Sequence, residues 1–205
     1  MDKVIDVSLV IPCHNLEQWI LPLIKSLNNL DLSNVTAEFI FVLDGCTDRT
    51  KEVIERNLRW ESRIIECEVR SCGRARNIGM ELARGEFLWF VDGDDMILDP
   101  NVLHNVIPLL RQKPECPAAR LKWSSNHYKL KLTMMVWQYI FRRQLVEDIF
   151  FTDKQPGEDQ EWTQKVFQLY PLHTFYHYPF EVYYYNYRRP GSNTTQFHEN
   201  GKIIY

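Results

Sequence analysis

The feature that most constrains this fold is an alternation of short apolar runs with segments of helical spacing in the first 91 residues. Three short apolar runs are interpreted as buried strands because each is bounded by proline, glycine or charged residues, and the segment 63–69 is a further strand candidate. The expected strands are 7–11, 39–43, 63–69 and 87–91, and the expected helices between them are 16–30, 48–58 and 75–83. We expect Pro12 to end the first strand, and Thr47 or Asp48 to cap the second helix. Strands that alternate with helices predict right-handed crossovers and a mostly parallel α/β sheet flanked by helices.

Polar residues follow these strands where a ligand would bind. In open α/β sheets the ligand crevice lies beyond the carboxyl ends of the strands. Asn15 and Glu17 follow the first strand, Asp44 follows the second, and Asp92-Gly93-Asp94-Asp95 follows the fourth. The sequence therefore predicts that acids and amides converge on one crevice.

The second half of the chain lacks this rhythm. After a probable helix at 101–110 come aromatic-rich segments at 134–141 and 175–187, with a helical pattern at 160–169 between them. We find no internal repeat. We expect one domain over 1–205, with a nucleotide-binding half at 1–112 and a smaller acceptor-side half at 113–205.

Composition excludes several classes of protein. The chain is 45% hydrophobic and 25% charged, which suits a packed core, and its net charge of −3 gives no general attraction for nucleic acid. The five cysteines include no CxxC pair, so a disulfide framework or structural zinc is not expected. No signal peptide is expected at the start, and no apolar run approaches the ~18 residues of a membrane-spanning helix. A cytoplasmic location fits best.

A basic stretch at 111–131 has two interpretations. It holds six lysines and arginines against one glutamate. It is a solvated surface, or it contacts an anionic partner such as lipid head groups at the inner face of a membrane.

The acidic cluster Asp92-Gly93-Asp94-Asp95 is the strongest candidate for chemistry. Three carboxylates in four residues repel one another, and Gly93 allows the chain to bend so that they converge. Mg²⁺ or Mn²⁺ that also binds substrate phosphates would relieve this repulsion. The alternative is a solvated turn, for which Asp-Gly is common material.

Three further motifs are candidates with structural alternatives. Arg76 lies in a helix start that favours an anion, but it can equally be a surface residue. The pair Glu158-Asp159 precedes a helix, where it either favours the helix dipole or supplies a general base. Arg188 and Arg189 either close over a diphosphate or form a polar turn.

Together these motifs resemble glycosyltransferase family 2, which has the GT-A fold. Residues 7–15 resemble the opening strand of that family, and residues 41–48 resemble its second strand and acidic turn. Residues 73–79 and 83–95 resemble the run that leads into its metal-binding motif. The segments 136–143 and 157–159 resemble its acceptor side, so the resemblance extends from Val4 to about Ser192.

The resemblance implies a role for each matching residue. Pro12, Asn15 and Glu17 would line the nucleoside pocket, Asp44 would contact the base, and Arg76 would help to hold the nucleotide. Asp92 would contact ribose and sugar, Asp94 would bind the metal, and Asp159, beside Glu158, would be the general base. The implied reaction is an inverting transfer from a nucleotide-diphosphate sugar, typically a UDP-sugar, to a saccharide or lipid-linked acceptor in surface polysaccharide or glycolipid synthesis. The sequence leaves homo-oligomer formation open.

Two alternatives remain at this stage. A sugar nucleotidyltransferase shares the α/β sheet, but it needs a glycine-rich basic loop after the first strand, where this chain has Pro12-Cys13-His14-Asn15. A non-catalytic module that binds sugar nucleotides or glycans would keep the pocket without the chemistry.

Overall fold

The strands form one mixed sheet in the structure, a computed structural model that describes residues 4–127, 134–154, 156–187 and 189–192. The strand order is β3-β2-β1-β4-β7-β6-β8-β5. The first half supplies β1 (Val7–Cys13), β2 (Ala37–Asp44), β3 (Ser62–Cys67), β4 (Phe87–Phe90) and the short β5 (Met96–Ile97). The second half supplies β6 (Ala118–Ser125), β7 (Tyr139–Arg142) and β8 (Tyr176–Tyr185).

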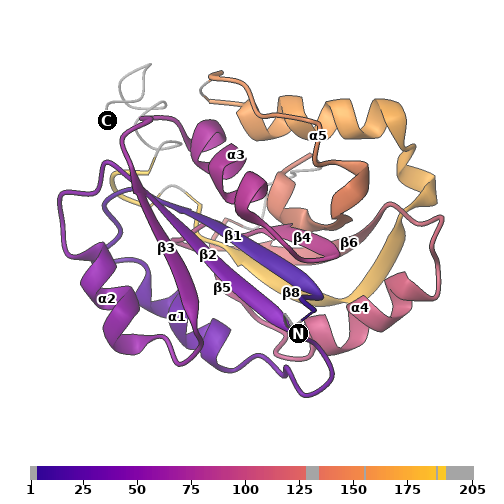
Figure 1. The fold of residues 1–205 in the computed structure, drawn as a ribbon, viewed down its shortest axis with the longest axis horizontal. Coiled ribbons are helices and arrows are strands. Elements are labelled where there is room, and N and C mark those ends of the chain that lie inside the picture. Colours follow the sequence, from indigo (N-terminus) through magenta and orange to yellow (C-terminus); the bar gives the residue numbers. More distant parts are fainter. Residues whose placement is uncertain (1–3, 128–133, 155, 188, 193–205) are drawn as a thin grey trace.

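Helices cover both faces of this sheet (Figure 1). One face carries α1 (Leu21–Asn28), α2 (Thr50–Asn57) and α4 (Val102–Arg111), and the other carries α3 (Cys72–Leu82) and α5 (Glu158–Leu169). Short 3-10 turns occur at η1 (Val136–Gln138), η2 (Arg143–Leu145) and η3 (Leu172–Thr174). The expected three-layer α/β architecture is confirmed.

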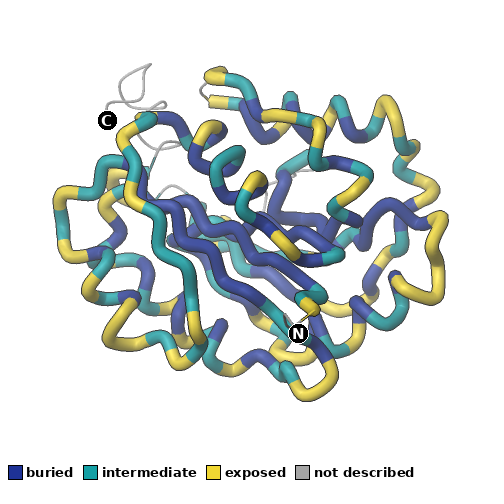
Figure 2. The backbone as a smooth tube through the Cα atoms, in the orientation of Figure 1, coloured by how far each residue is buried: buried dark blue, intermediate teal, exposed yellow. Residues whose placement is uncertain are grey.

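The central strands are buried on both faces, as Figure 2 shows in dark blue. In β4, Phe87 and Trp89 pack beneath α1 and α4, whereas Leu88 and Phe90 pack beneath α3 and α5. Alternate side chains of a strand point to opposite faces, so a strand covered on both sides must be apolar throughout. This requirement explains the continuous apolar runs in the sequence.

The first strand and the second helix differ from their predicted boundaries. β1 continues through Pro12, which pairs with Val42 of β2, so the expectation that Pro12 ends the strand is wrong. The proline ring fixes a φ that extended backbone tolerates and removes only one N–H donor. The N-cap residue of α2 is Arg49 rather than Thr47 or Asp48, although Asp48 Oδ1 accepts from the Thr50 backbone N–H at 3.1 Å.

The topology brings the carboxyl ends of six strands to one edge of the sheet. β1, β2, β3 and β4 are mutually parallel, and β6 and β8 run in the same direction because antiparallel β7 separates β6 from β4. The pairing of β4 with β7 makes the sheet continuous across the two halves of the chain. The edge strand β5, at the opposite end of the sheet from β3, contacts α1, because the Ile97 backbone N–H donates to Ser26 Oγ at 3.1 Å. The loops at the carboxyl edge therefore form the natural place for a site.

Candidate active site

The loops after β1 and β4 pack directly against each other at this edge. A Cβ atom added to Gly93 would lie 2.5 Å from Leu16 Cδ1 and 3.3 Å from the Pro12 carbonyl oxygen. Pro12 itself is buried. The glycine of the acidic cluster is therefore required for close approach, and this approach holds Asp92 and Asp94 beside the β1 loop.

A pocket of about 570 Å³ opens between the loops that follow β1, β2 and β3. It is lined by His14, Asn15, Leu43, Gly45, Cys46, Thr47, Glu66, Cys67, Glu68 and Arg70. Asn15 has a left-handed backbone (φ 50°), and its Oδ1 accepts from the Thr47 backbone N–H at 2.8 Å. Of the predicted donor residues that the structure describes, Asn15 alone lines this pocket.

Glu17 and Asp44 hold the loops around this pocket in place. Glu17 accepts from the backbone and side chain of Arg49, and the Arg49 hydrogen bonds lower the pKa of Glu17. Both carboxylate oxygens of buried Asp44 accept backbone N–H groups, from Arg70 and from Ser71, each at 2.8 Å. Asp44 thereby shapes the loop before α3, and that loop places Arg70 in the pocket wall.

Arg76 is buried between the loop that follows β4 and the start of α5. Its side chain is 3% exposed, with Nη2 donating to Asp92 Oδ1 at 2.7 Å and Nη1 donating to Glu158 Oε1 at 2.9 Å. The guanidinium also lies over the Phe151 ring, 5.5 Å from its centroid. Burial of this kind with two charge-assisted bonds fixes the distance between β4 and α5. The alternative in which Arg76 is a surface residue at a helix start is wrong, because Phe151, Thr152 and Glu158 pack against the start of α3.

Close packing at the start of α3 explains this enclosure. A Cβ atom on Gly73 would lie 2.6 Å from the Thr152 carbonyl oxygen, so only glycine allows the segment to approach. Asn77 also stabilises the packing of this segment on α3. Its Nδ2 donates to the Phe151 carbonyl at 2.9 Å, and its Oδ1 accepts from the Phe151 N–H at 2.8 Å. Neither contact was predicted, since nothing in the sequence pairs residues this far apart.

The acidic cluster presents its carboxylates to different neighbours. Asp92 is bound by Arg76, and Asp94 Oδ2 accepts from Arg189 Nε, whose guanidinium lies over the Trp19 ring at 5.7 Å. Buried Asp95 accepts from the Asn186 backbone N–H at 2.8 Å. Burial, reinforced by Asp94, raises the pKa of Asp95 well above its ordinary range. Asp95 is thus a structural anchor for the chain after β8, a role that sequence reasoning did not assign.

Asp159 is held at the first turn of α5 in surroundings that favour its neutral form. It is 7% exposed, and burial, followed by the charge of Glu158, raises its pKa to about 7. Arg76 and the Gln160 backbone N–H, which donates to Asp159 Oδ1 at 2.8 Å, oppose this shift. Burial also raises the pKa of Asp92, against the influence of Arg76. A carboxyl group with a pKa near neutrality is suited to accept a proton under physiological conditions.

The acids fit a metal that a bound diphosphate shares. Asp92 and Asp94 come from one loop and have side chains that are 22% and 18% exposed. Among the described residues no group of three or more His, Cys, Asp or Glu side chains is arranged to hold a metal. Mg²⁺ and its analogues are commonly held by one or two carboxylates together with substrate phosphates, and this arrangement needs no such group.

The remaining predicted residues divide between the site and its surroundings. Arg189 joins the acidic cluster, and Arg188 lies outside the described residues. In the basic stretch, Arg111 forms ion pairs with Asp6 and Glu86, whereas Lys129 and Lys131 lie outside the described residues. In the part of the chain that the structure describes, no helix is long and apolar enough to span a membrane.

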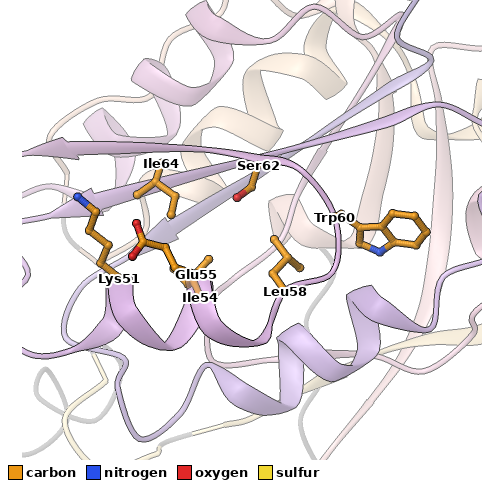
Figure 3. A pocket seen from close by; sticks show the side chains of 7 residues that line it. All are labelled: Lys51, Ile54, Glu55, Leu58, Trp60, Ser62 and Ile64. Atoms are coloured by element: carbon orange, nitrogen blue, oxygen red, sulfur yellow. The ribbon is translucent and has the colours of Figure 1, made fainter.

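A second hollow, of about 440 Å³, lies between α2 and the outer strand β3 (Figure 3). Its lining includes Lys51, Glu55, Leu58 and Trp60, and it contains none of the predicted site residues. The Trp60 Nε1–H donates to the Leu27 carbonyl at 2.9 Å, so this ring serves the packing of α1 on the sheet. The carboxyl-edge crevice remains the candidate site.

The fold and the carboxyl-edge acids define an α/β protein with its candidate site at the carboxyl ends of the strands, and comparison with known proteins identifies the family. The profile of the family described as glycosyl transferase family 2 matches residues 8–167. The chain belongs to this family, and its GT-A fold is confirmed.

The relatives include curated proteins and solved structures. The chain is 28% identical over 194 residues to the uncharacterized glycosyltransferase EpsJ of Bacillus subtilis, covering 79% of this chain and 56% of that protein. It is similar to Staphylococcus aureus TarS 1-349 in complex with UDP-GlcNAc (TM-score 0.80, 23% identity, 93% of this chain and 61% of that one). It is also similar to glucosyl-3-phosphoglycerate synthase of Mycobacterium tuberculosis with Mn²⁺ and UDP (TM-score 0.70, 18% identity, 98% and 81%). The chain spans about half the length of EpsJ and about a third of full-length TarS, a poly(ribitol-phosphate) beta-N-acetylglucosaminyltransferase.

Proposed function

We propose that this chain transfers a sugar from a nucleotide-diphosphate donor, a UDP-sugar, to a hydroxyl group of an acceptor, with inversion at the anomeric carbon. The 1–112 half binds the donor and the 113–205 half binds the acceptor. The observation that carries this proposal is the link Asp92–Arg76–Glu158, which ties the acidic cluster to the first turn of α5, where Asp159 lies. Sugar transfer requires that the acids that hold the donor and the base that activates the acceptor stay at a constant separation.

The donor would occupy the pocket beside Asn15 and extend toward the acidic cluster. The pocket volume of about 570 Å³ is within the range of small-molecule sites. The solved structures similar to this chain include complexes with UDP and UDP-GlcNAc, and one with GDP-Man and Mn²⁺. These complexes support a nucleotide donor, and the choice of uracil over guanine rests on the family resemblance.

Asp94, with Asp92 beside it, would hold Mn²⁺ or Mg²⁺ together with the diphosphate oxygens. When bound there, the cation stabilises the negative charge that develops on the leaving diphosphate. Arg189 contributes positive charge to the same loop through Asp94 and, with Arg188, would contact the diphosphate.

Asp159 would act as the general base. Its carboxylate accepts the proton of the acceptor hydroxyl, the hydroxyl oxygen bonds to the anomeric carbon, and the bond from that carbon to the diphosphate oxygen breaks. The bonding electrons leave with the nucleoside diphosphate. A pKa of about 7 allows Asp159 to be deprotonated in a useful fraction of molecules and still be basic enough to accept a proton. Glu158 helps to set this pKa through its charge.

The acceptor would be a saccharide or a lipid-linked saccharide in surface polysaccharide or glycolipid synthesis. Contact with the inner face of a membrane and homo-oligomer formation stay predictions. A cytoplasmic location is part of the same proposal.

The donor site is tested by calorimetry with UDP in the presence and absence of Mn²⁺. We expect Mn²⁺ to strengthen UDP binding to the wild-type chain, and we expect Asp94→Asn to lose about tenfold or more of that gain. Asp148→Asn, a change at an exposed acid outside the crevice, is the matched control. If UDP does not bind with Mn²⁺ present, the proposed donor site is wrong.

A further inference from the structure

Three segments that are far apart in the chain meet at the Asp94 carboxylate. Asp94 lies in the loop after β4, and its Oδ2 accepts from Arg189 Nε in the segment after β8. The Arg189 guanidinium lies over the ring of Trp19, in the loop between β1 and α1, 5.7 Å from the ring centroid. The Arg189 side chain is 9% exposed. Arg189 is therefore packed against the proposed metal ligand rather than extended into solvent.

The segment that carries Arg189 is anchored to the same acidic cluster. The Asn186 backbone N–H donates to Asp95 Oδ1 at 2.8 Å, and Asn186 Nδ2 donates to the Asp94 carbonyl at 3.4 Å. This anchor lies only three residues before Arg189 in the chain. It keeps the guanidinium within reach of the cluster even when the bond to the Asp94 carboxylate is broken.

A tight turn follows the anchor and begins at Arg189. The Ser192 backbone N–H donates to the Arg189 carbonyl at 3.1 Å, which closes a four-residue turn. Pro190 and Gly191 occupy its two central positions, and the φ of Gly191 is 76°. Proline followed by a residue of positive φ is the pattern that a type II turn prefers. Arg189 therefore stands on a turn and not on a helix or strand.

The two arginines that pair with the acidic cluster are held differently. Arg76 belongs to α3 and bridges two carboxylates, Asp92 and Glu158, with a side chain that is 3% exposed. Arg189 reaches Asp94 from the turn, whose two central residues are exposed. A side chain on an exposed turn is displaced at lower cost than one enclosed between a helix and a sheet. We therefore expect Arg189, and not Arg76, to give up its carboxylate to a competing cation.

Charge determines when this exchange is favourable. A divalent cation beside Asp94 is repelled by the guanidinium groups of Arg76 and Arg189, and Arg189 loses its ion pair when it is displaced into water. A diphosphate that arrives with the cation supplies negative charge that offsets this repulsion. It also offers phosphate oxygens, which a guanidinium binds well through paired N–H donors. Arg189 then exchanges one anionic partner for another.

We propose that Arg189 is a positioning residue that makes divalent-metal binding at Asp94 depend on the donor diphosphate. Arg189 occupies Asp94 Oδ2, supported by the Trp19 ring, until the diphosphate offers it another anion. This inference rests on the proposed transferase function for the metal and the donor. It adds the order in which the site is loaded, with cation and nucleotide binding together rather than the cation first.

The proposal is tested by measuring Mn²⁺ binding to the full chain with and without UDP, by electron paramagnetic resonance of free Mn²⁺, and UDP binding in Mn²⁺ by calorimetry. Arg189→Met removes the competing cation and the phosphate contact together. We expect Mn²⁺ alone to bind this variant about fivefold to tenfold more tightly than the wild type, and UDP in Mn²⁺ to bind about fivefold to tenfold more weakly. Arg56→Met, at an exposed pair with Glu52 in the last turn of α2, changes the net charge equally and is the matched control.

Two further variants separate the contributions to the exchange. Trp19→Leu removes the ring beneath the guanidinium and leaves Arg189 and Asp94 in place. Mn²⁺ alone should then bind about twofold to fivefold more tightly, and UDP affinity in Mn²⁺ should fall less than in Arg189→Met. Arg189→Lys keeps the charge but loses the paired donors, so it should lie between the wild type and Arg189→Met for both ligands.

Two results would overturn the proposal. One is that Mn²⁺ alone binds Arg189→Met no more tightly than the wild type, and the other is that this variant gains Mn²⁺ affinity equally with and without UDP. Unfolding cannot produce the expected gain in affinity, and circular dichroism melting checks each sample. If the wild type binds no UDP in Mn²⁺, the proposed donor site is wrong and this inference falls with it. If the wild type binds UDP in Mn²⁺ and Arg189→Met shows no gain, only the exchange is wrong.

Discussion

Two arginines at opposite edges of the sheet each bridge two carboxylates, and the comparison separates a buried centre from an exposed one. At the carboxyl edge Arg76 joins Asp92 to Glu158, and at the amino edge Arg111 joins Asp6 to Glu86. The Arg76 side chain is 3% exposed, whereas that of Arg111 is 40% exposed.

The two arginine centres differ in how far their charged groups are removed from water. Removing an ion group from water costs several kcal/mol, and a buried pair regains this only with good geometry. Exposed pairs contribute little and are screened by salt. Arg111 fastens α4 to the starts of β1 and β4 at little cost. Burial of the Arg76 ion pairs carries a desolvation penalty that a purely structural link between β4 and α5 would not require. The penalty is understandable if the acids of this centre also act in the candidate site.

The largest expected effect concerns the base at the carboxyl edge. Asp159→Asn removes the proton acceptor and should lower the transfer rate about 10²- to 10⁴-fold while UDP binding persists. In the wild type, transfer should fall as the pH drops below about 7, because Asp159 becomes protonated. The measurement is a pH profile of transfer, with Glu86→Gln at the amino edge as the control that keeps activity. Unchanged transfer in Asp159→Asn would assign the base elsewhere.

Loss of the two arginines should affect stability very differently. Arg76→Met removes the ion-pair partner of buried Glu158 and of partly buried Asp92 and should cost about 3–5 kcal/mol of unfolding free energy. Arg111→Met should cost about 1 kcal/mol or less, and less still at high salt. Urea denaturation at low and high ionic strength measures both. Similar losses for the two variants would remove the distinction drawn between the edges.

Stability should also depend on pH through Asp159. Its pKa is raised to about 7 in the folded chain, so the native state retains a proton that the unfolded chain releases at about pH 4. The favourable contribution of this proton is complete below that lower pKa and is lost as the pH rises through about 7. Asp159→Asn should therefore be more stable than the wild type at pH 8, by on the order of 2 kcal/mol. At pH 4 the two should be similar, and a constant difference across this range would contradict the raised pKa.

A last comparison concerns two tightly packed glycines, one at each edge of the sheet. A Cβ atom on Gly85 would meet the Ser8 backbone nitrogen at 2.6 Å and the Val7 carbonyl carbon at 2.7 Å, and neither atom can move independently of β1. At Gly93 the nearest atom is the end of the Leu16 side chain, which can rotate. We expect Gly85→Ala to cost about 2–3 kcal/mol and Gly93→Ala about 1–2 kcal/mol, with UDP affinity reduced only in Gly93→Ala. Thermal unfolding and calorimetry test this order, and a larger loss of UDP affinity in Gly85→Ala would reverse it.

The sequence predicted the regular first half well because one physical signal dominates there. Strands buried on both faces must be apolar, so β1, β2 and β4 were located from their side chains alone. β3 is only half-buried, and it spans Ser62–Cys67 where the sequence predicted 63–69. In the second half, β6 was not located, since its exposed face carries Lys122 and its end pairs with β8 through irregular register.

The site shows a similar division. Asp92, Asp94 and Asp159 were found because acids after a strand or before a helix are conspicuous, whereas the burial of Arg76 was not foreseen. Glu158 lies 82 residues from Arg76 in the chain, and no local sequence pattern predicts their contact. Asp44 likewise looked like a ligand contact, and only the fold revealed that two backbone N–H groups occupy its oxygens.

The sequence by itself determined the α/β class, the family and the acids of the crevice, because burial periodicity and short motifs are local properties of the chain. The tertiary structure decided which charges meet, which carboxyl groups are desolvated, and where the aromatic rings of the second half gather. Those outcomes depend on distances between residues remote in sequence, and ionisation in turn depends on the burial that these distances create. The acidic cluster was thus visible in the sequence, but the pairing of its members with Arg76, Arg189 and Asn186 required the fold.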